Sequence, residues 1–265
     1  MKIGMIIPAA GASNRYSDAG GLRPKLDEDL GGRPVIQRTV ELFTKRPEVG
    51  AIVVAGPASD EDFAAFSERH ADRMALLGAV LCRGGVETRT QTVRNALAHI
   101  DNDCTHIGVH DGARPAPSDQ LLDRVFTAAR SHDAVIPGVP VSDTLKRVED
   151  LEDGVADVDP LDAILGGAGK VEGAAQVVVD TVPREGLVGV QTPQVFEAGL
   201  LRRAYEEDRA GMTDDAQMVE AVGGRVVVVA GEARNIKITT PDDLQLVRAM
   251  LGTKGPSERP THKRF

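Results

Sequence analysis

KIGMIIPAAGASNRYSDAGGLRPK, residues 2–25, decides the fold. It opens with a short apolar run typical of a buried strand, and small residues with a glycine follow at once. It matches neither the phosphate-loop formula G-x-x-x-x-G-K-[ST] nor the dinucleotide fingerprint G-x-G-x-x-G. Two interpretations remain open. The stretch is either a strand-to-helix turn whose small residues only avoid clashes, or a cradle in which backbone N–H groups, Arg15 and Lys25 hold a phosphate chain.

Outward from this stretch, apolar runs alternate with segments of helical spacing. The sequence predicts further strands at 51–56, 79–83, 106–110 and 133–139, and helices at 34–46, 58–72, 88–100 and 118–131. Continuous apolar, β-branched runs separated by helices predict an α/β fold, with a mainly parallel sheet and helices on both faces. Ligands of such sheets bind beyond the carboxyl ends of the strands, where segments 8–25, 84–89 and 110–115 fall.

The alternation breaks between about residues 140 and 190. Two predicted strands, 139–148 and 174–184, are joined by a segment rich in glycine, aspartate and glutamate with little periodicity. This pattern indicates a hairpin-like β-arm, 140–186, that protrudes from the core and has a long solvated tip, 149–176.

The regular pattern resumes after the arm. We expect a strand at 191–196, a helix near 196–209, a helix at 213–223 capped by Thr213, a strand at 225–231, and a terminal helix opened by Pro241. The whole of 1–252, arm included, is expected to form one domain, followed by a polar tail at 253–265.

Composition excludes several classes of function. A net charge of −9 argues against general nucleic-acid binding, and 3% aromatic residues argue against base stacking on aromatic platforms. No apolar run approaches the roughly 20 residues that span a bilayer, so no membrane association is expected. The 2 cysteines are too few for a disulfide framework, which favours a cytoplasmic location. An acidic protein that binds a polyphosphate must concentrate its cations locally, beside the glycine loops.

Two further segments carry candidate chemistry. HDGARP, 110–115, is either an Asp-Gly turn with an internal Asp111–Arg114 pair, or a site in which Asp111 binds magnesium or ribose and Arg114 clamps a second phosphate. NIKITTPDDL, 235–244, places Lys237 in a short predicted strand, where a solvated lysine is the ordinary alternative. Histidine pairs at zinc-ligand spacing, C-x-x-C pairs and a G-x-S-x-G elbow are absent from the sequence, so zinc hydrolysis and serine esterase chemistry have no support.

In this order the motifs resemble one family, the 2-C-methyl-D-erythritol 4-phosphate cytidylyltransferases of the non-mevalonate isoprenoid pathway. The resembling segments are PAAGASNRY (8–16), PKL (24–26), GGVETRTQTV (84–93), VHDGARP (109–115), VPVSDTLKR (139–147), TVPREGL (181–187), QTPQVF (191–196), TDDAQMVE (213–220) and NIKITTPDDL (235–244). They cover nearly the whole chain. The resemblance implies a Rossmann-like nucleotidyltransferase fold, CTP and a polyol phosphate as substrates, Mg²⁺ as cofactor, and a homodimer built through the arm.

The resemblance also implies roles for individual residues. Those expected at the nucleotide are Ala9, Ala10 and Gly11 under the triphosphate, Gly84, Gly85, Arg89 and Thr92 at the cytosine, and Asp111 at the ribose and the metal. Those expected at the acceptor are Arg114 and, from the neighbouring subunit's arm, Thr144 and Arg184 at its phosphate, with Thr192 and Thr213 as further contacts. The cations expected to stabilise the transition state are Arg15, Lys25 and Lys237. An ionised phosphate oxygen is the nucleophile, so no general base is needed.

The sequence departs from the family pattern at several places. Residues 17–23 look like an insertion, Leu26 stands for the usual glutamine, Thr92 for serine, and Pro183 for aspartate before Arg184. Because the last change lies in the arm, transfer to another polyol phosphate, such as ribitol 5-phosphate, is an alternative. A catalytically silent nucleotide-binding protein is a third, which the three retained cations disfavour.

Overall fold

The computed structural model describes residues 1–253 apart from 12, 151–175, 208 and 210. It divides into two compact units. One comprises Met1–Val139 with Val190–Phe265, and the other is Pro140–Gly189.

The first unit is built on a mixed, mainly parallel sheet. Its strands follow the order β10-β5-β9-β4-β1-β2-β3. Their bounds are β1 Ile3–Pro8, β2 Val49–Gly56, β3 Ala79–Arg83, β4 His106–Val109, β5 Ala134–Pro140, β9 Gln194–Glu197 and β10 Val227–Ala230. β1 pairs in parallel with both β2 and β4, whereas β9 runs antiparallel between β4 and β5. The loops that follow β1 and β4 therefore open at the same edge of the sheet.

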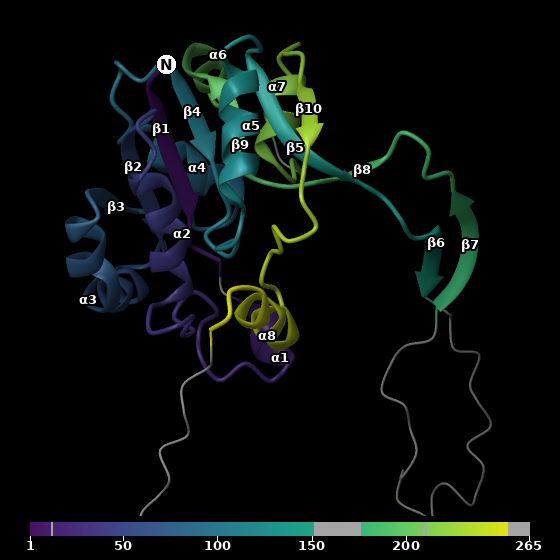
Figure 1. Ribbon diagram of the computed structural model, residues 1–265, viewed down its shortest axis with the longest axis horizontal. Helices are drawn as coiled ribbons and strands as arrows, with labels where there is room; N and C mark the ends of the chain where they lie inside the picture. The colour runs from purple at the N-terminus through teal and green to yellow at the C-terminus, as the bar shows by residue number, and fades with distance from the viewer. Residues whose placement is uncertain (12, 151–175, 208, 210, 254–265) are drawn as a thin grey trace, which may run out of the picture. The chain divides into compact units, whose positions relative to one another are not determined.

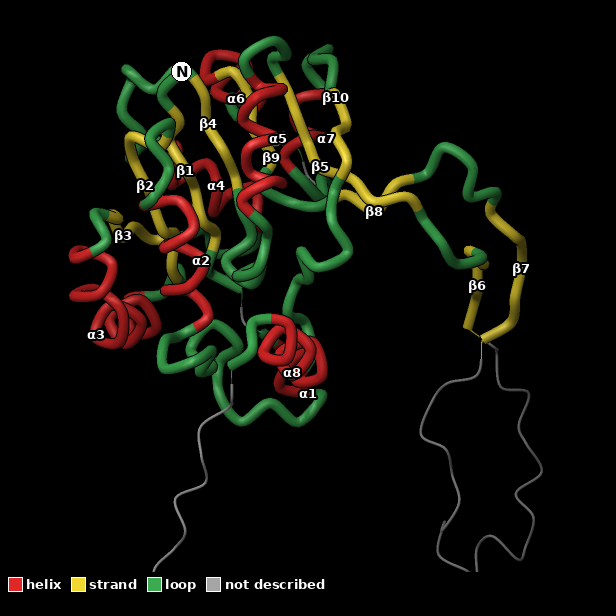
Figure 2. Tube along the Cα trace, in the orientation of Figure 1, coloured by secondary structure: helices red, strands yellow, loops and turns green. Residues whose placement is uncertain are grey.

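Helices cover both faces of this sheet (Figures 1 and 2). The helices are α1 Asn14–Asp18, α2 Val35–Thr44, α3 Asp60–Leu76, α4 Arg89–Leu97, α5 Asp119–Ala129, α6 Ala198–Ala204, α7 Asp215–Glu220 and α8 Pro241–Met250. Strand alternation divides the core: Ile3, Met5 and Ile7 of β1 join one apolar cluster with α2, α3, α5 and α8. Ile6 faces the other cluster, with α4, α6 and α7. The predicted α/β fold, with a mainly parallel sheet and helices on both faces, is confirmed.

Local chemistry fixes where several helices begin. α4 starts after Thr88, whose hydroxyl accepts the Gln91 N–H at 3.1 Å. α8 has Pro241 in its first turn and a reciprocal capping box between Thr240 and Asp243.

Three sequence-based expectations about element bounds are wrong. Asp214, not Thr213, caps α7, because its carboxylate accepts the Gln217 N–H at 2.9 Å. The helix expected near 196–209 is the shorter α6. Lys237 lies in an irregular segment, tied to the core where the N–H of Ile238 donates to the Ala113 carbonyl, and not in a strand.

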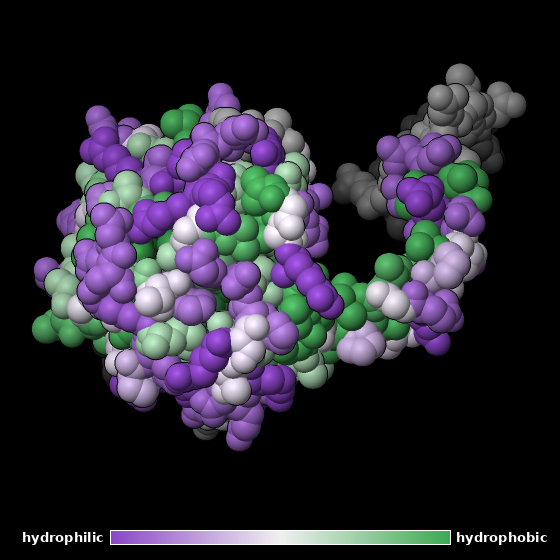
Figure 3. Space-filling model, turned by 90° about the horizontal axis from the view of Figure 1, so that it is seen from above, coloured by the Kyte–Doolittle hydropathy of each residue, from purple (hydrophilic) through white to green (hydrophobic). Residues whose placement is uncertain are grey.

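The second unit contains the two strands predicted for the arm. β6, Leu145–Asp150, and β7, Gln176–Val182, form an antiparallel pair. β8, Val188–Val190, crosses the boundary between the two units and pairs with β5. Apolar side chains lie at the surface of the β6–β7 pair, where Val177, Val178 and Val179 are each about half exposed, and Figure 3 shows apolar and polar residues interleaved along it. Most of the predicted arm tip and all of the predicted tail after Thr253 lie outside the described residues. No helix in the described part of the chain is long and apolar enough to cross a membrane.

Candidate active site

A cleft of about 390 Å³ opens where the loops after β1, β3 and β4 meet. Its walls contain nine of the residues expected at the site: Ala9, Ala10, Gly11, Lys25, Gly85, Arg89, Thr92, Asp111 and Lys237. A 230 Å³ hollow beside it contains Arg15 with Lys25, and a 250 Å³ hollow contains Arg114, Thr192 and Thr213 with Asp111 and Lys237. Sequence reasoning therefore selected residues that fold into one region of the first unit.

The loop after β1 leaves room above its backbone. A Cβ added at Gly11 would meet no protein atom within 4 Å, and Gly11 has no positive φ. Neither packing nor backbone conformation of the described residues therefore requires glycine at this position. A ligand lying directly against the backbone would require it, which favours the cradle interpretation over the simple turn.

Gly84 and Gly85, after β3, are required for a different reason, because a side chain at either position would clash with the protein. A Cβ at Gly84 would lie 2.6 Å from the Gly56 carbonyl oxygen, and a Cβ at Gly85 would lie 2.2 Å from the Cβ of Gln91. The Thr92 hydroxyl accepts the Gly85 N–H at 3.0 Å and donates to the Thr88 carbonyl at 3.2 Å. These residues hold the segment 84–88 in a tight turn, so Thr92 acts on the shape of the cleft wall. Serine offers the same hydroxyl.

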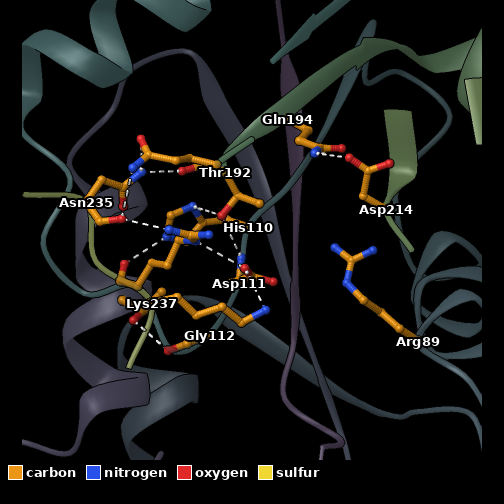
Figure 4. Close-up of polar contacts among 12 residues, drawn as sticks. Arg89, His110, Asp111, Gly112, Thr192, Gln194, Asp214, Asn235 and Lys237 are labelled. Atoms are coloured by element: carbon orange, nitrogen blue, oxygen red, sulfur yellow. Dashed lines mark hydrogen bonds and ion pairs between the residues drawn. The ribbon is translucent and has the colours of Figure 1, made fainter. Parts of the chain in front are cut away.

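Asp111 is a carboxylate surrounded by the cationic side chains of the cleft. Its Oδ2 lies 3.1 Å from Lys237 Nζ and 3.1 Å from Arg114 Nε (Figure 4 shows the contact with Lys237). Burial works to raise the pKa of Asp111. The positive charges of Lys237, Arg89 and Arg114 outweigh burial and hold that pKa well below its ordinary range. The carboxylate is thus ionised, and the internal Asp111–Arg114 pair exists within a larger cationic group.

Lys25 completes this cationic group. Burial and the nearby charges of Lys237 and Arg15 lower the pKa of Lys25, while Asp111 acts in the opposite direction. Cations that depress one another in this way gain when a polyanion binds among them. The expected local concentration of positive charge in an acidic protein is present here.

The acidic residues that follow Lys25 are used by the scaffold. Asp27 accepts from the ring of buried His70 at 2.6 Å and pairs with Arg69 at 2.8 Å, both on α3. The backbone carbonyl of Asp29 accepts from the guanidinium of Arg248 on α8. These contacts fix the segment after Lys25.

Arg89 has a buried counterion that the sequence did not single out. Its guanidinium donates to Asp215 at 2.7 Å, and the other oxygen of this fully buried carboxylate accepts from the Tyr205 hydroxyl at 2.5 Å. Burial works against the charge of Arg89, but Asp215 raises its pKa above the ordinary value. The guanidinium lies at the boundary between the 390 Å³ cleft and the 250 Å³ hollow, because it lines both.

Other site residues missed from the sequence hold the loops together. Gln194 donates to Asp214 at 2.9 Å and accepts from the Ala216 N–H, which anchors the start of α7. The Asn235 side-chain amide donates to the Thr192 backbone carbonyl at 2.8 Å, and the backbone carbonyl of Asn235 accepts from the Arg114 guanidinium at 2.7 Å. The only sequence signal for them was their place inside the motifs QTPQVF, TDDAQMVE and NIKITTPDDL.

Thr144 and Arg184 belong to the second unit. The Arg184 guanidinium donates to the backbone carbonyl of Ser142, and both side chains are exposed. Their expected contact with the acceptor phosphate stays a prediction.

Comparison with known proteins identifies the family of the chain. A profile of the family IspD, 2-C-methyl-D-erythritol 4-phosphate cytidylyltransferase, matches residues 3–159 and 162–253. The chain belongs to the IspD family. A 2-C-methyl-D-erythritol 4-phosphate cytidylyltransferase from Frankia casuarinae is 37% identical to this chain over 258 residues. The match covers 97% of this chain and 84% of the relative. Another, from Solibacter usitatus, is 35% identical, covering 95% of this chain and 96% of the relative.

The fold agrees with solved IspD structures. The crystal structure of a 4-diphosphocytidyl-2C-methyl-D-erythritol synthase superposes with a TM-score of 0.69 and 31% sequence identity. The match covers 94% of this chain and 99% of that one. The resemblance first inferred from short motifs is confirmed over the length of the chain.

Proposed function

We propose that this chain transfers the cytidylyl group of CTP to 2-C-methyl-D-erythritol 4-phosphate, releasing pyrophosphate. The observation that carries the proposal is the group of cations around ionised Asp111, at the strand ends of an IspD fold. A reaction between two polyanions needs such a group, because their mutual repulsion must be overcome before they can meet.

The bond changes balance without a general base. An ionised oxygen of the acceptor phosphate attacks the α-phosphorus of CTP and forms a new P–O bond. The bond from the α-phosphorus to the bridging oxygen breaks, and its electron pair leaves with pyrophosphate. The negative charge of the five-coordinate state is stabilised by Arg15, Lys25 and Lys237.

The nucleotide lies against the two loops of the cleft. The backbone at Ala9, Ala10 and Gly11 supports the triphosphate, where Gly11 leaves open space. The tight turn at Gly84 and Gly85, held by Thr92, presents its backbone to the cytosine, with Arg89 beside it.

A magnesium ion fits this donor set only as a partner of the triphosphate. Among the described residues, no cluster of three or more histidine, cysteine or carboxylate side chains could hold a metal alone. Mg²⁺ usually binds one or two carboxylates together with substrate phosphates, and Asp111 supplies one ionised carboxylate in the cleft. When bound, the ion would neutralise charge on the phosphates.

The acceptor lies in the 250 Å³ hollow that contains Arg114, Thr192 and Thr213. We infer that a second copy of the chain completes this site with its Thr144 and Arg184, and that the protein is a homodimer. The exposed valines of the β6–β7 pair support this inference, because half-exposed apolar side chains on a two-stranded ribbon favour association. A cytoplasmic location is inferred from Cys82 and Cys104, which are buried and unpaired.

Pyrophosphate release with CTP and Mg²⁺ across a panel of polyol and sugar phosphates tests the proposal. Turnover with 2-C-methyl-D-erythritol 4-phosphate alone supports it. Preference for ribitol 5-phosphate would replace the acceptor, and no turnover with any acceptor would leave only nucleotide binding. Sedimentation tests the dimer, with Arg184→Ala expected mainly to raise KM for the acceptor. A fully active monomer would contradict the shared site.

A further inference from the structure

Lys25 and Lys237 line the same cleft, but they are held in place by different means. Nζ of Lys237 lies 3.1 Å from a carboxylate oxygen of Asp111. Within the part of the chain that the structure describes, no carboxylate oxygen lies within 4.0 Å of the Lys25 amine. The place of Lys25 in the cleft therefore depends on the backbone turn that carries it.

The turn that carries Lys25 is closed at Asp27. The Asp27 N–H donates to the Pro24 carbonyl at 2.8 Å, which leaves Lys25 and Leu26 as the two central residues. Leu26 is buried, and its carbonyl accepts from the N–H of Ile36 in the first turn of α2. One side of the turn is thus tied to α2, and the other side is tied through the side chain of Asp27.

Asp27 is held by two consecutive side chains of α3. Its Oδ1 lies 2.6 Å from Nε2 of His70, and its Oδ2 lies 2.8 Å from Nε of Arg69. A carboxylate oxygen only accepts, so Nε2 of His70 carries the hydrogen and donates it. Both oxygens of this short side chain therefore have a partner on α3, and together these partners fix the backbone at the end of the turn.

Packing alone does not explain why residue 70 is a histidine. The ring of His70 is 2% exposed and packs against Phe66, with the ring centroids 4.7 Å apart. Its Nδ1 is buried and has no hydrogen-bond partner among the described residues, which costs free energy. An aliphatic side chain would keep the contact with Phe66 and avoid that cost. What the histidine adds is a donor that reaches Asp27.

We propose that Asp27 and His70 are positioning residues for Lys25, so that α3 holds the turn and the turn holds the amine at the phosphates. The inference rests on the proposed function and deepens it, because it names the scaffold on which one transition-state cation depends. Neither residue was among those selected from the sequence. Catalytic groups must be held to within about 0.5 Å, so a looser turn should slow the chemical step even though the cleft keeps all its cations.

The first test removes the charge of Asp27 with little change of shape. Asp27→Asn should lower kcat by about 10- to 100-fold and change KM for CTP by less than about 3-fold, because the lysine is misplaced rather than lost. Arg69→Ala should lower kcat in the same direction. Arg73→Ala, which removes an exposed arginine from the next turn of α3, is the matched control and should keep the wild-type kcat. An unchanged kcat in Asp27→Asn would overturn the proposal.

A double-mutant cycle separates positioning from a general effect on the fold. If Asp27 acts through Lys25, Asp27→Asn should lower kcat by less than about 2-fold when Lys25→Ala is already present. An equal loss with and without Lys25→Ala would show that Asp27 supports the fold rather than the lysine, which contradicts the proposal.

Two substitutions at His70 test its role as a donor. His70→Gln keeps an N–H group that can reach Asp27 and should retain kcat to within about 3-fold of the wild type. His70→Leu keeps the apolar contact with Phe66 but has no donor, so kcat should fall as it does in Asp27→Asn. Equal kcat values in the two variants would overturn the role of His70. Should the leucine variant fail to fold, the cycle between Asp27 and Lys25 still decides the proposal.

The reactivity of Lys25 gives a readout that needs no substrate. An amine-acylating reagent should modify Lys25 several-fold faster in Asp27→Asn than in the wild-type protein, as measured by mass spectrometry of the Lys25 peptide. Lys237, held by Asp111, is the internal control and should react at an unchanged rate. An unchanged rate at Lys25 would contradict the proposal. Turnover with no acceptor would refute the proposed function, and this measurement would still decide whether Asp27 positions the lysine.

Discussion

Two glycine-containing turns look alike in the sequence: Gly11 follows β1, and Gly84 and Gly85 follow β3. In the structure, glycine is present in these two turns for different physical reasons. A side chain at Gly11 would enter open space, whereas side chains at Gly84 and Gly85 would collide with the backbone or with α4. A glycine therefore indicates a ligand-binding position only where no protein atom would contact an added side chain. We therefore propose that the loop after β1 is the phosphate cradle and that the turn after β3 is the scaffold beside it.

The largest expected effect belongs to the cradle. Lys25→Ala should lower kcat by about 10²- to 10³-fold, because it removes one cation from the charged transition state. Urea unfolding should change little, since the lysine amine lies among other cations. Arg23→Ala, at an exposed position close in sequence, is the control and should keep its kcat. Equal losses of stability and activity in Lys25→Ala would mean that the loop is structural.

The free energy of unfolding should depend on pH through His110, in the loop after β4. Burial lowers the pKa of His110 to about 4, whereas an unfolded histidine titrates near 6.5. Between about pH 6.5 and 4, the unfolded chain therefore binds a proton that the folded chain does not. Stability should therefore fall as the pH drops from about 6.5 to 4, by up to about 3 kcal/mol from this group.

Urea unfolding at several pH values measures this dependence. His110→Gln should flatten the slope between pH 6.5 and 4. His132→Gln, at an exposed position, should leave it as in the wild type. An unchanged slope in His110→Gln would contradict the assignment.

The glycines themselves give the sharpest contrast. Gly85→Ala should destabilise the protein by about 1–3 kcal/mol, because its Cβ would lie 2.2 Å from that of Gln91. Gly11→Ala should change the free energy of unfolding by less than about 0.5 kcal/mol and instead raise KM for CTP. If Gly11→Ala unfolds the protein or leaves KM for CTP unchanged, the distinction between cradle and scaffold fails.

The smallest effect is expected at Thr92. Serine keeps the hydroxyl that joins the Gly85 N–H to the Thr88 carbonyl. Thr92→Ser should therefore alter kcat/KM for CTP by less than about 3-fold, whereas Thr92→Val should weaken CTP binding by loosening the turn. Indistinguishable kinetics of the serine and valine variants would show that the hydroxyl has no part in shaping the cleft.

The sequence was sufficient for the parallel part of the fold, because each buried strand is a continuous apolar run. It was also sufficient to select Lys25 and Asp111, whose motifs follow strands and which line one cleft in the structure. Lys237 lines the same cleft from an irregular segment, and only the family resemblance singled it out. It could not reveal Asp215 as the partner of Arg89, since these residues are 126 positions apart and only the packing of α7 beside α4 joins them. His110 was hidden for a similar reason. One of its partners is the Arg114 carbonyl in the same loop, but the other, Thr192, lies 82 positions away along the chain.

The most direct test of the central claim is ³¹P NMR of the wild-type protein with CTP, Mg²⁺ and 2-C-methyl-D-erythritol 4-phosphate. We predict that the monoester signal of the acceptor disappears while a pyrophosphate diester and free pyrophosphate appear in equal amounts, and that Lys25→Ala slows this conversion. Persistence of the monoester signal alongside intact CTP would contradict the assignment of the cationic cleft to cytidylyl transfer.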